Sequence, residues 1–194
     1  MKTESENLSA QQSLDLITSM ITQAKGKAQK NVFYFLLWGW IVALCNIGMY
    51  ALYKVDYAYP YAVWLITIPA WLYSMYRGYR QSRNKLNSTP LDRISATLWI
   101  SFGVIVFTLV AFGSHINYQL NPIILLVASI PTLVSGVILR FRPLIIGGIL
   151  FWVFGIICFL ISPDQQLLMG ALAIVCGYLV PGYMLKGHQG DTNA

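Results

Sequence analysis

Charged residues are scarce in this sequence. Of its 194 residues, 10% are Asp, Glu, Lys or Arg, while 57% are hydrophobic. An average soluble domain carries about 25% charged residues. A soluble domain of this length could not bury so much apolar surface, because its surface-to-volume ratio is too high. The composition therefore argues against an ordinary soluble protein and predicts one compact domain that has lipid as its solvent.

Charge is missing altogether from six long apolar stretches, which hold no Asp, Glu, Lys, Arg or His. They are 32–53, 58–76, 94–114, 120–139, 143–161 and 165–185. A helix needs roughly 20 residues to cross the hydrocarbon of a bilayer. The runs are continuous and do not alternate, which favours helices over a barrel. We therefore predict an all-α membrane protein, a bundle of six transmembrane helices over 32–185, with a cytoplasmic tail over 1–31 and a polar C-terminal tail over 186–194.

The residues that most membrane chemistry requires are also missing. Ion-coupled transporters usually carry ionisable side chains inside their spans, and these spans have none. No His-Glu-x-x-His box, Gly-x-Ser-x-Gly elbow or Walker loop occurs, and the two histidines are isolated. The three cysteines all fall inside spans, without the spacing of a metal site or a disulfide framework. We therefore predict no enzyme activity, no metal and no cofactor.

The basic residues predict the orientation of the chain. The first thirty residues hold no apolar signal-peptide core, so we expect the first span to act as the targeting signal. Lys and Arg concentrate in cytoplasmic loops of membrane proteins. With the N-terminus inside, the opposite side holds Lys54 alone, and the cytoplasmic side holds Lys2, Lys25, Lys27, Lys30, Arg77, Arg80, Arg83, Lys85, Arg93, Arg140, Arg142 and Lys186. We predict that both termini are cytoplasmic. The net charge of +6 is interpreted as a collar at the membrane surface, not as a nucleic-acid site.

Residues 8–30 have the pattern of an amphipathic helix. Ser9 and Gln12 form a capping box, and an apolar stripe follows at helical spacing, made of Leu14, Ile17, Ile21, Ala24 and Ala28. One interpretation is an interfacial helix that packs under the bundle. The alternative is a short coiled coil or a segment on which a partner docks.

Prolines mark the helix starts and three predicted kinks. Five stand at the starts of the second to sixth helices, where a missing N–H costs nothing: Pro60, Pro90, Pro122, Pro143 and Pro163. Three of these starts also carry predicted caps, which are Thr89 with Asp92, Asn121, and Ser162 with Gln165. Pro69, Pro131 and Pro181 lie inside helices, where each should free a carbonyl that faces protein or a polar cavity.

Two of these helices also resemble each other. Residues 60–80 (PYAVWLITIPAWLYSMYRGYR) and 122–142 (PIILLVASIPTLVSGVILRFR) match without gaps at both prolines and at the final arginine. We interpret this as a duplicated helical hairpin, extended by a third hairpin over 143–185; chance similarity between apolar segments is the alternative. Small residues at four-residue spacing predict close helix packing, at Ala128, Thr132 and Gly136 and again at Ala173 and Gly177.

Two sets of candidate functional residues follow. Asn46 is the most polar residue within a span and requires a hydrogen bond across helices, either to fix packing or to line a polar pathway with the kinked helices. The pathway or packing set is Asn46, Thr67, Pro69, Ser129 and Pro131. The set for contact with lipid headgroups is Arg77, Arg80, Arg83, Lys85, Arg140 and Arg142. Tyrosine and tryptophan crowd the first hairpin, as aromatic belts at the two interfaces do.

The segment Arg142–Gly182, which is the third predicted hairpin, resembles small six-helix bacterial inner-membrane proteins of the HdeD-like acid-resistance kind, which implies the same location for this chain. Its Pro-x-x-x-Gly-Gly and Ser-Pro-Asp motifs carry that resemblance, which covers about a fifth of the chain. The whole chain looks more like an uncharacterised bacterial membrane family, which implies no activity. From the residues, we expect a non-enzymatic module that binds a membrane partner or a second copy of itself. The alternative is a facilitator or channel for a small neutral or cationic solute.

Overall fold

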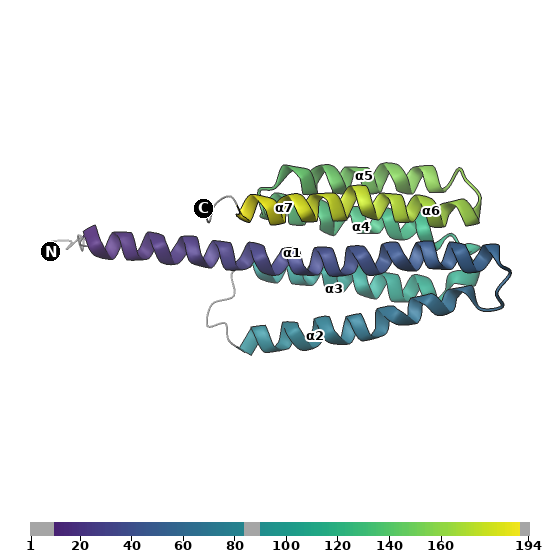
Figure 1. The fold of residues 1–194 in the computed structure, drawn as a ribbon, viewed down its shortest axis with the longest axis horizontal. Helices are drawn as coiled ribbons and strands as arrows, with labels where there is room; N and C mark the ends of the chain where they lie inside the picture. Colours follow the sequence, from purple (N-terminus) through teal and green to yellow (C-terminus); the bar gives the residue numbers. More distant parts are fainter. Residues whose placement is uncertain (1–9, 84–89, 191–194) are drawn as a thin grey trace.

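The structure is a computed structural model that describes residues 10–83 and 90–190, with side chains over 32–80 and 93–187. Every regular element in these ranges is helical, and the helices lie along one common direction (Figure 1). In chain order they are α1 (Ala10–Lys54), η1 (Pro60–Ile66), α2 (Thr67–Arg83), α3 (Pro90–Ala111), η2 (Gly113–Ile116), α4 (Leu120–Ile138), α5 (Arg142–Cys158), α6 (Pro163–Ile174), η3 (Val175–Leu179) and α7 (Val180–Gly190). The all-α prediction is confirmed.

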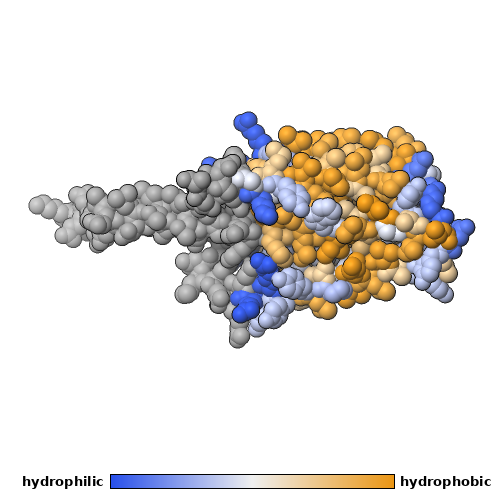
Figure 2. Space-filling model, in the orientation of Figure 1, coloured by the Kyte–Doolittle hydropathy of each residue, from blue (hydrophilic) through white to orange (hydrophobic). Residues whose placement is uncertain are grey.

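Four stretches of helix are long and apolar enough to cross a membrane: Val32–Lys54, Arg93–Ala111, Leu120–Ile138 and Pro163–Gly187. The surface agrees with this. Figure 2 shows a broad hydrophobic band with hydrophilic residues gathered at its two ends. Large apolar side chains point outward, among them Phe107 at 76% and Leu160 at 81% exposed. A soluble monomer rarely exposes so large an apolar surface, so this band is consistent with a membrane protein.

The first span is longer than expected. The sequence predicts an amphipathic helix over 8–30 that either lies on the cytoplasmic surface or rises from it, and α1 is one continuous helix from Ala10 to Lys54. Its N-terminal part projects beyond the ends of the other helices (Figure 1). The sequence of α1 contains no proline and three glycines, Gly26, Gly39 and Gly48, and the polar stretch before Val32 consists largely of good helix formers. The separate interfacial helix is therefore a wrong prediction, while the capping residue Ser9 lies outside the described residues.

The second predicted span, 58–76, is built differently from the others. It begins as the 3-10 helix η1 and continues as α2 to Arg83. Pro69 stands in the first turn of α2, where its missing N–H is tolerated, so the predicted kink appears as a change of helix type. The Thr67 hydroxyl donates to the carbonyl of Trp64 at 2.6 Å. Pro69 itself is exposed, so the prediction that it faces protein or a polar cavity is wrong.

The helices α4 and α5 form the most extensive pairing in the molecule. Leucines of α4 lie over glycines of α5, so that a Cβ on Gly148 would stand 2.5 Å from Cγ of Leu133 and one on Gly155 would stand 2.9 Å from Cγ of Leu126. The predicted stripe of small residues on α4, from Ala128 to Gly136, is buried. Close backbone approach at small residues is the usual way in which helices associate in lipid.

This pairing joins two predicted hairpins, because α4 belongs to the second and α5 to the third; α3 also contacts α4, and α5 also contacts α6, as the hairpins require. The prolines that the repeat aligns also differ in place: Pro131 is buried inside α4, whereas Pro69 is exposed at the start of α2. The helix α2 lies at the edge of the bundle (Figure 1), and the span Arg93–Ala111 of α3 contains no buried residue. Their outward faces are the ones that a bilayer would cover.

The last helix is continuous but changes form in the middle. The π-helical segment η3 joins α6 to α7, and the N–H of Val180 bonds to the carbonyl of Val175. Pro181 follows directly and has no N–H for the carbonyl of Gly177, so the predicted disturbance by Pro181 appears as this π segment. The freed oxygen lies against Gly147 of α5, at a place where a Cβ would collide with it. Gly147 and Gly177 are the closest backbone approach between α5 and the last helix that the described glycines show.

The helix starts agree with the proline pattern better than with the predicted caps. Pro60, Pro90 and Pro163 are the first residues of their helices, and Pro143 is the second of α5. Asn121 is not a cap, because α4 begins at Leu120 after Gln119. Ser162 is the N-cap of α6, but its hydroxyl donates to Oδ1 of Asp164 at 2.6 Å and not to the helix backbone. Thr89 lies outside the described residues.

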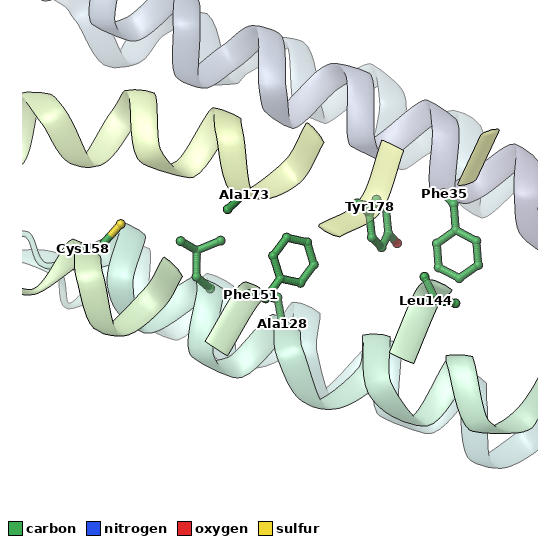
Figure 3. Close-up of a cluster of buried hydrophobic side chains, with 8 residues drawn as sticks. Phe35, Ala128, Leu144, Phe151, Cys158, Ala173 and Tyr178 are labelled. Carbon is green, nitrogen blue, oxygen red and sulfur yellow. The ribbon is translucent and has the colours of Figure 1, made fainter. Parts of the chain in front are cut away.

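A core of large and small side chains fills the middle of the bundle. Figure 3 shows Phe151 of α5 and Tyr178 of η3 between the helices, with Phe35 of α1 close by. The ring of Tyr178 meets that of Phe35 edge-on with 4.9 Å between centroids, and Trp99 of α3 joins them at 6.2 Å. We call these four side chains the aromatic plug: Phe35, Trp99, Phe151 and Tyr178. They pack in the centre of the bundle.

Candidate functional site

Five polar side chains are buried among the described residues: Asn46, Ser129, Thr132, Ser135 and Gln166. The three hydroxyl groups have partners. Ser129 donates to the carbonyl of Leu126 at 2.6 Å, and Thr132 donates to that of Ala128 at 2.8 Å. The hydroxyl of Ser135 accepts from the indole N–H of Trp99 at 3.3 Å. Such bonds back to the helix or to a neighbour satisfy a hydroxyl without any ligand, so the two buried amides stand out.

One buried amide is Gln166, which is 2% exposed in the first turns of α6. Its Nε2 donates to Oε1 of Gln119, just before α4, at 2.9 Å and to the carbonyl of Ile161 at 3.4 Å. The bond between two amides joins the starts of α4 and α6. This hydrogen bond lies at the end of the bundle that contains the connection from α3 to α4 and the connection from α5 to α6.

The other buried amide is Asn46 in α1, also 2% exposed. Its Nδ2 donates to the carbonyl of Val42, one turn earlier, at 2.9 Å. Its Oδ1 has no hydrogen-bond partner. A buried polar atom without a partner costs about 1–3 kcal/mol, so its presence requires an explanation.

Gly170 of α6 lies directly opposite Asn46. A Cβ on Gly170 would stand 3.1 Å from Oδ1 of Asn46 and 3.6 Å from Oδ1 of Asn121 in α4. Two amide oxygens from two helices therefore converge on the side of α6 that has no side chain. Gln166 lies one turn before Gly170 on the same face of that helix. We call Asn46, Gln119, Asn121, Gln166 and Gly170 the amide site.

The sequence of α1 explains why Asn46 is buried. Val32, Phe35, Gly39 and Ala43 are buried at helical spacing, and Asn46 continues the same stripe. This face packs against α6, η3 and α7. Apolar residues on either side thus position one amide within an otherwise apolar interface, about 12 Å from the end of α1 at Lys54.

A salt bridge lies beyond the amide site at the same end of the bundle. Nζ of Lys54 in α1 stands 3.3 Å from Oδ2 of Asp164 in α6, and both side chains are partly exposed. The hydroxyl of Ser162 donates to the other oxygen of Asp164. An exposed pair of this kind contributes at most about 1 kcal/mol, so it positions the helix ends more than it stabilises them.

The remaining predicted pathway residues do not gather at the amide site. Thr67 and Pro69 lie on α2, which packs on α1 and η1, and the Thr67 hydroxyl is satisfied within its own chain segment. Ser129 and Pro131 are buried in α4, which packs on α5, α3 and α6. A groove of about 280 Å³ on the outside of α6 is lined by Ile161, Gln165, Leu168, Met169 and Leu172 and contains none of the predicted residues.

The described members of the predicted headgroup set lie at the opposite end of the bundle from the amide site. The guanidinium of Arg77 stands over the ring of Phe33, 3.8 Å from its centroid. Arg80 near the end of α2 is exposed, as are Arg140 in the turn between α4 and α5 and Arg142 at the start of α5. The side chain of Arg83 and all of Lys85 lie outside the described residues.

Four members of the amide site were missed at the sequence level. Gln119, Gln166 and Gly170 carry no motif, and Asn121 was predicted only as a cap. A usable signal was the presence of Gln119, Asn121 and Gln166 near the starts of the helices α4 and α6. Over 10–83 and 90–190, no group of three or more His, Cys, Asp or Glu residues is arranged to hold a metal ion.

Comparison with known proteins returned no match to a family model, a curated protein or a solved structure.

Proposed function

We propose that this chain is a six-span protein of the bacterial inner membrane, with both termini in the cytoplasm, that binds a partner through the projecting part of α1. The observation that carries the proposal is that α1 continues about 22 residues before Val32 and passes the end of the bundle (Figure 1). At 1.5 Å per residue, this arm is about 33 Å long.

The second predicted crossing, formed by η1 and α2, is not among the four helical stretches that are long and apolar enough by themselves. Its combined length nevertheless supports a crossing. The seven residues of η1 rise about 14 Å as a 3-10 helix. The 17 residues of α2 add about 26 Å. Together they exceed the ~30 Å of hydrocarbon. Arg77 and Arg80 near the end of α2 would then reach the cytoplasmic headgroups.

The sequence of the arm supports association with another helix. Leu14, Ile17 and Ile21 recur at the spacing of one helical face, with Ala24 and Ala28 continuing it. The apolar stripe of the arm is about two heptads long, so it can bury little apolar surface. The partner that this short stripe favours is a second copy of this chain, which lies in the same membrane with its arm parallel. Confinement to one membrane raises the effective concentration of the two arms.

Paired triple variants in mild detergent or nanodiscs test this proposal. Leu14, Ile17 and Ile21 are changed together to Gln, which preserves helix propensity and removes the apolar face. Gln12, Ser19 and Gln23 on the opposite face are changed to Ala as the matched control. We expect crosslinked or native-mass dimers in the wild type and the control, and monomers in the Leu14/Ile17/Ile21 variant. A monomeric wild type without a co-purified partner, or dimers in all three proteins, would contradict the proposal.

The amide site favours a second candidate, a facilitator for a small neutral or cationic solute. The unpartnered Oδ1 of Asn46 is the specific observation in its support. The aromatic plug is apolar and Pro69 is exposed on the outside of the bundle, so neither continues the amide site into a polar pathway. Flux of a solute across vesicles that contain the wild type, lost in Asn46→Leu, would favour this candidate; no flux with a broad panel of solutes would argue against it.

A further inference from the structure

The turn between α4 and α5 contains an arginine at a place where helices commonly end in glycine. Arg140 is the second residue after α4 and has a φ of 52°, in the left-handed region. The N–H of Phe141 bonds to the carbonyl of Gly136 at 2.9 Å, so the turn closes the end of α4 as a glycine turn does. A side chain disfavours this backbone conformation. Strained residues of this kind cluster at functional sites, so the side chain of Arg140 requires an explanation.

A second cation stands in an unfavourable place two residues later. Arg142 is the first residue of α5, where the partial charge of the helix end is positive, and the first turn of α5 contains no acidic residue. Arg140 and Arg142 are both exposed, and neither has an ion pair or a side-chain hydrogen bond within the part of the chain whose side chains are described. The carboxylates in that part, Asp56 and Asp164, lie at the opposite end of the bundle. Two cations and a positive helix end therefore share one turn without an anion from the described chain.

The outer surface of α5 indicates which anion fits this turn. Three apolar side chains follow Arg142 at spacings of four, three and four residues, so all four residues lie on one face of the helix. The three are Ile146, Ile149 and Val153, and they point outward with 57%, 47% and 44% of their surface exposed. We call Arg142, Ile146, Ile149 and Val153 the α5 stripe. A phospholipid has the same order of parts, a phosphate followed by apolar acyl chains, whereas a free phosphate ion would not use the apolar residues.

We propose that Arg140 and Arg142 bind the phosphate of an anionic phospholipid whose acyl chain lies along the α5 stripe. Guanidinium groups bind phosphate oxygens through two parallel hydrogen bonds, and the absence of a nearby carboxylate favours a headgroup without an ammonium group. The phosphate offsets both unfavourable features of the turn, which are the left-handed backbone of Arg140 and the positive end of α5. Arg77, another predicted headgroup residue, differs because its guanidinium lies over the ring of Phe33. The proposal rests on the membrane location of the proposed function, but not on the arm or on association between copies.

Thermal unfolding of the full chain in nanodiscs tests the proposal, with phosphatidylcholine alone compared with a mixture that contains phosphatidylglycerol. A lipid that binds the folded protein raises its unfolding temperature. We expect phosphatidylglycerol to raise the unfolding temperature of the wild type, and we expect this increase to be lost when Arg140 and Arg142 are both changed to Gln. The matched control changes Arg93 and Lys186 to Gln, since both are exposed at the same end of the bundle. It removes the same amount of charge and should keep the increase.

The variant Arg140→Gly separates lipid binding from folding. Relief of the left-handed backbone should raise its unfolding temperature in phosphatidylcholine, while loss of one guanidinium should reduce the further increase from phosphatidylglycerol. This variant also replaces the double Gln variant if the latter does not fold. Three outcomes would overturn the proposal: no increase in the wild type, an undiminished increase in the variants of Arg140 and Arg142, and the same increase when inorganic phosphate is added to phosphatidylcholine nanodiscs. None of them bears on the dimer measurement with the arm variants, so the two proposals fail separately.

Discussion

At the scale of single residues, glycines determine how closely the helices approach. Gly136, Gly148 and Gly155 hold α4 and α5 together, and Gly147 meets the backbone of Gly177. In lipid, apolar side chains gain little by leaving their solvent, so packing of this kind carries much of the association between helices. A methyl group at these positions must therefore cost more than at a glycine that faces lipid.

Gly148→Ala is expected to destabilise the bundle by about 1–3 kcal/mol, the usual cost of overpacking a core. The added Cβ would stand 2.5 Å from Cγ and 2.9 Å from the backbone N of Leu133, so the neighbour cannot move away by a side-chain rotation alone. Equilibrium unfolding by SDS in mixed micelles provides the measurement. Gly103→Ala is the control, and it should be neutral or slightly stabilising because Ala is the better helix former. Equal destabilisation of the two variants would contradict this packing.

Residue patterns predicted some of these features and not others. The small residues of α4 were predicted as a packing stripe because their spacing is visible in the sequence. The other members of the amide site were not predicted, because Gln119, Asn121 and Gln166 come near one another only when the helices pack. Thr67 and Ser129 looked polar in the sequence, but their hydroxyls bond to their own helical segments.

At the scale of elements, the turn between α4 and α5 joins the most closely paired helices. The N–H of Phe141 bonds to the carbonyl of Gly136 at 2.9 Å, and Arg140 has a φ of 52°. This is a helix end in which glycine normally takes the left-handed position. An L-residue with a side chain pays roughly 1–2 kcal/mol for that conformation.

Arg140→Gly is therefore expected to stabilise the protein, by about 1 kcal/mol in SDS unfolding, through relief of the left-handed backbone. Arg142→Gly is the matched control, because it removes the same charge from the same turn at a helical residue of α5. Glycine in a helix is unfavourable, so the control should be neutral or destabilised. If both variants change stability alike, charge and not backbone conformation decides the effect.

Element boundaries show which sequence signals were strong. The four long spans agree with the predicted ranges to within about three residues at most ends, because a run without charge ends where charge or proline begins. The continuity of α1 was not predicted. Its composition changes from polar to apolar near residue 31, but the helix does not break there. The 3-10 start of the second span was missed, since no simple residue pattern distinguishes it from an α-helix.

At the scale of the whole molecule, the structure is a helical bundle with an apolar outside and hydrophilic ends (Figure 2). The interior contains the aromatic plug, buried hydroxyls and the amide site, while large apolar side chains face outward. Such an arrangement requires lipid as solvent. The number of crossings depends on η1 with α2 and on α5. Neither is among the four long apolar stretches, because α2 carries Arg77 and Arg80 and α5 has only 17 residues.

The most direct measurement is the side of the membrane on which single cysteines are labelled, at positions 56, 80, 115, 140 and 162 in turn. The background replaces Cys45, Cys158 and Cys176, and an impermeant maleimide is added to whole cells and to inverted vesicles. Six crossings predict labelling from outside at 56, 115 and 162 and from the cytoplasmic side at 80 and 140. Labelling of 80 from the same side as 56 would contradict the six-span arrangement, because η1 and α2 would then not cross the membrane.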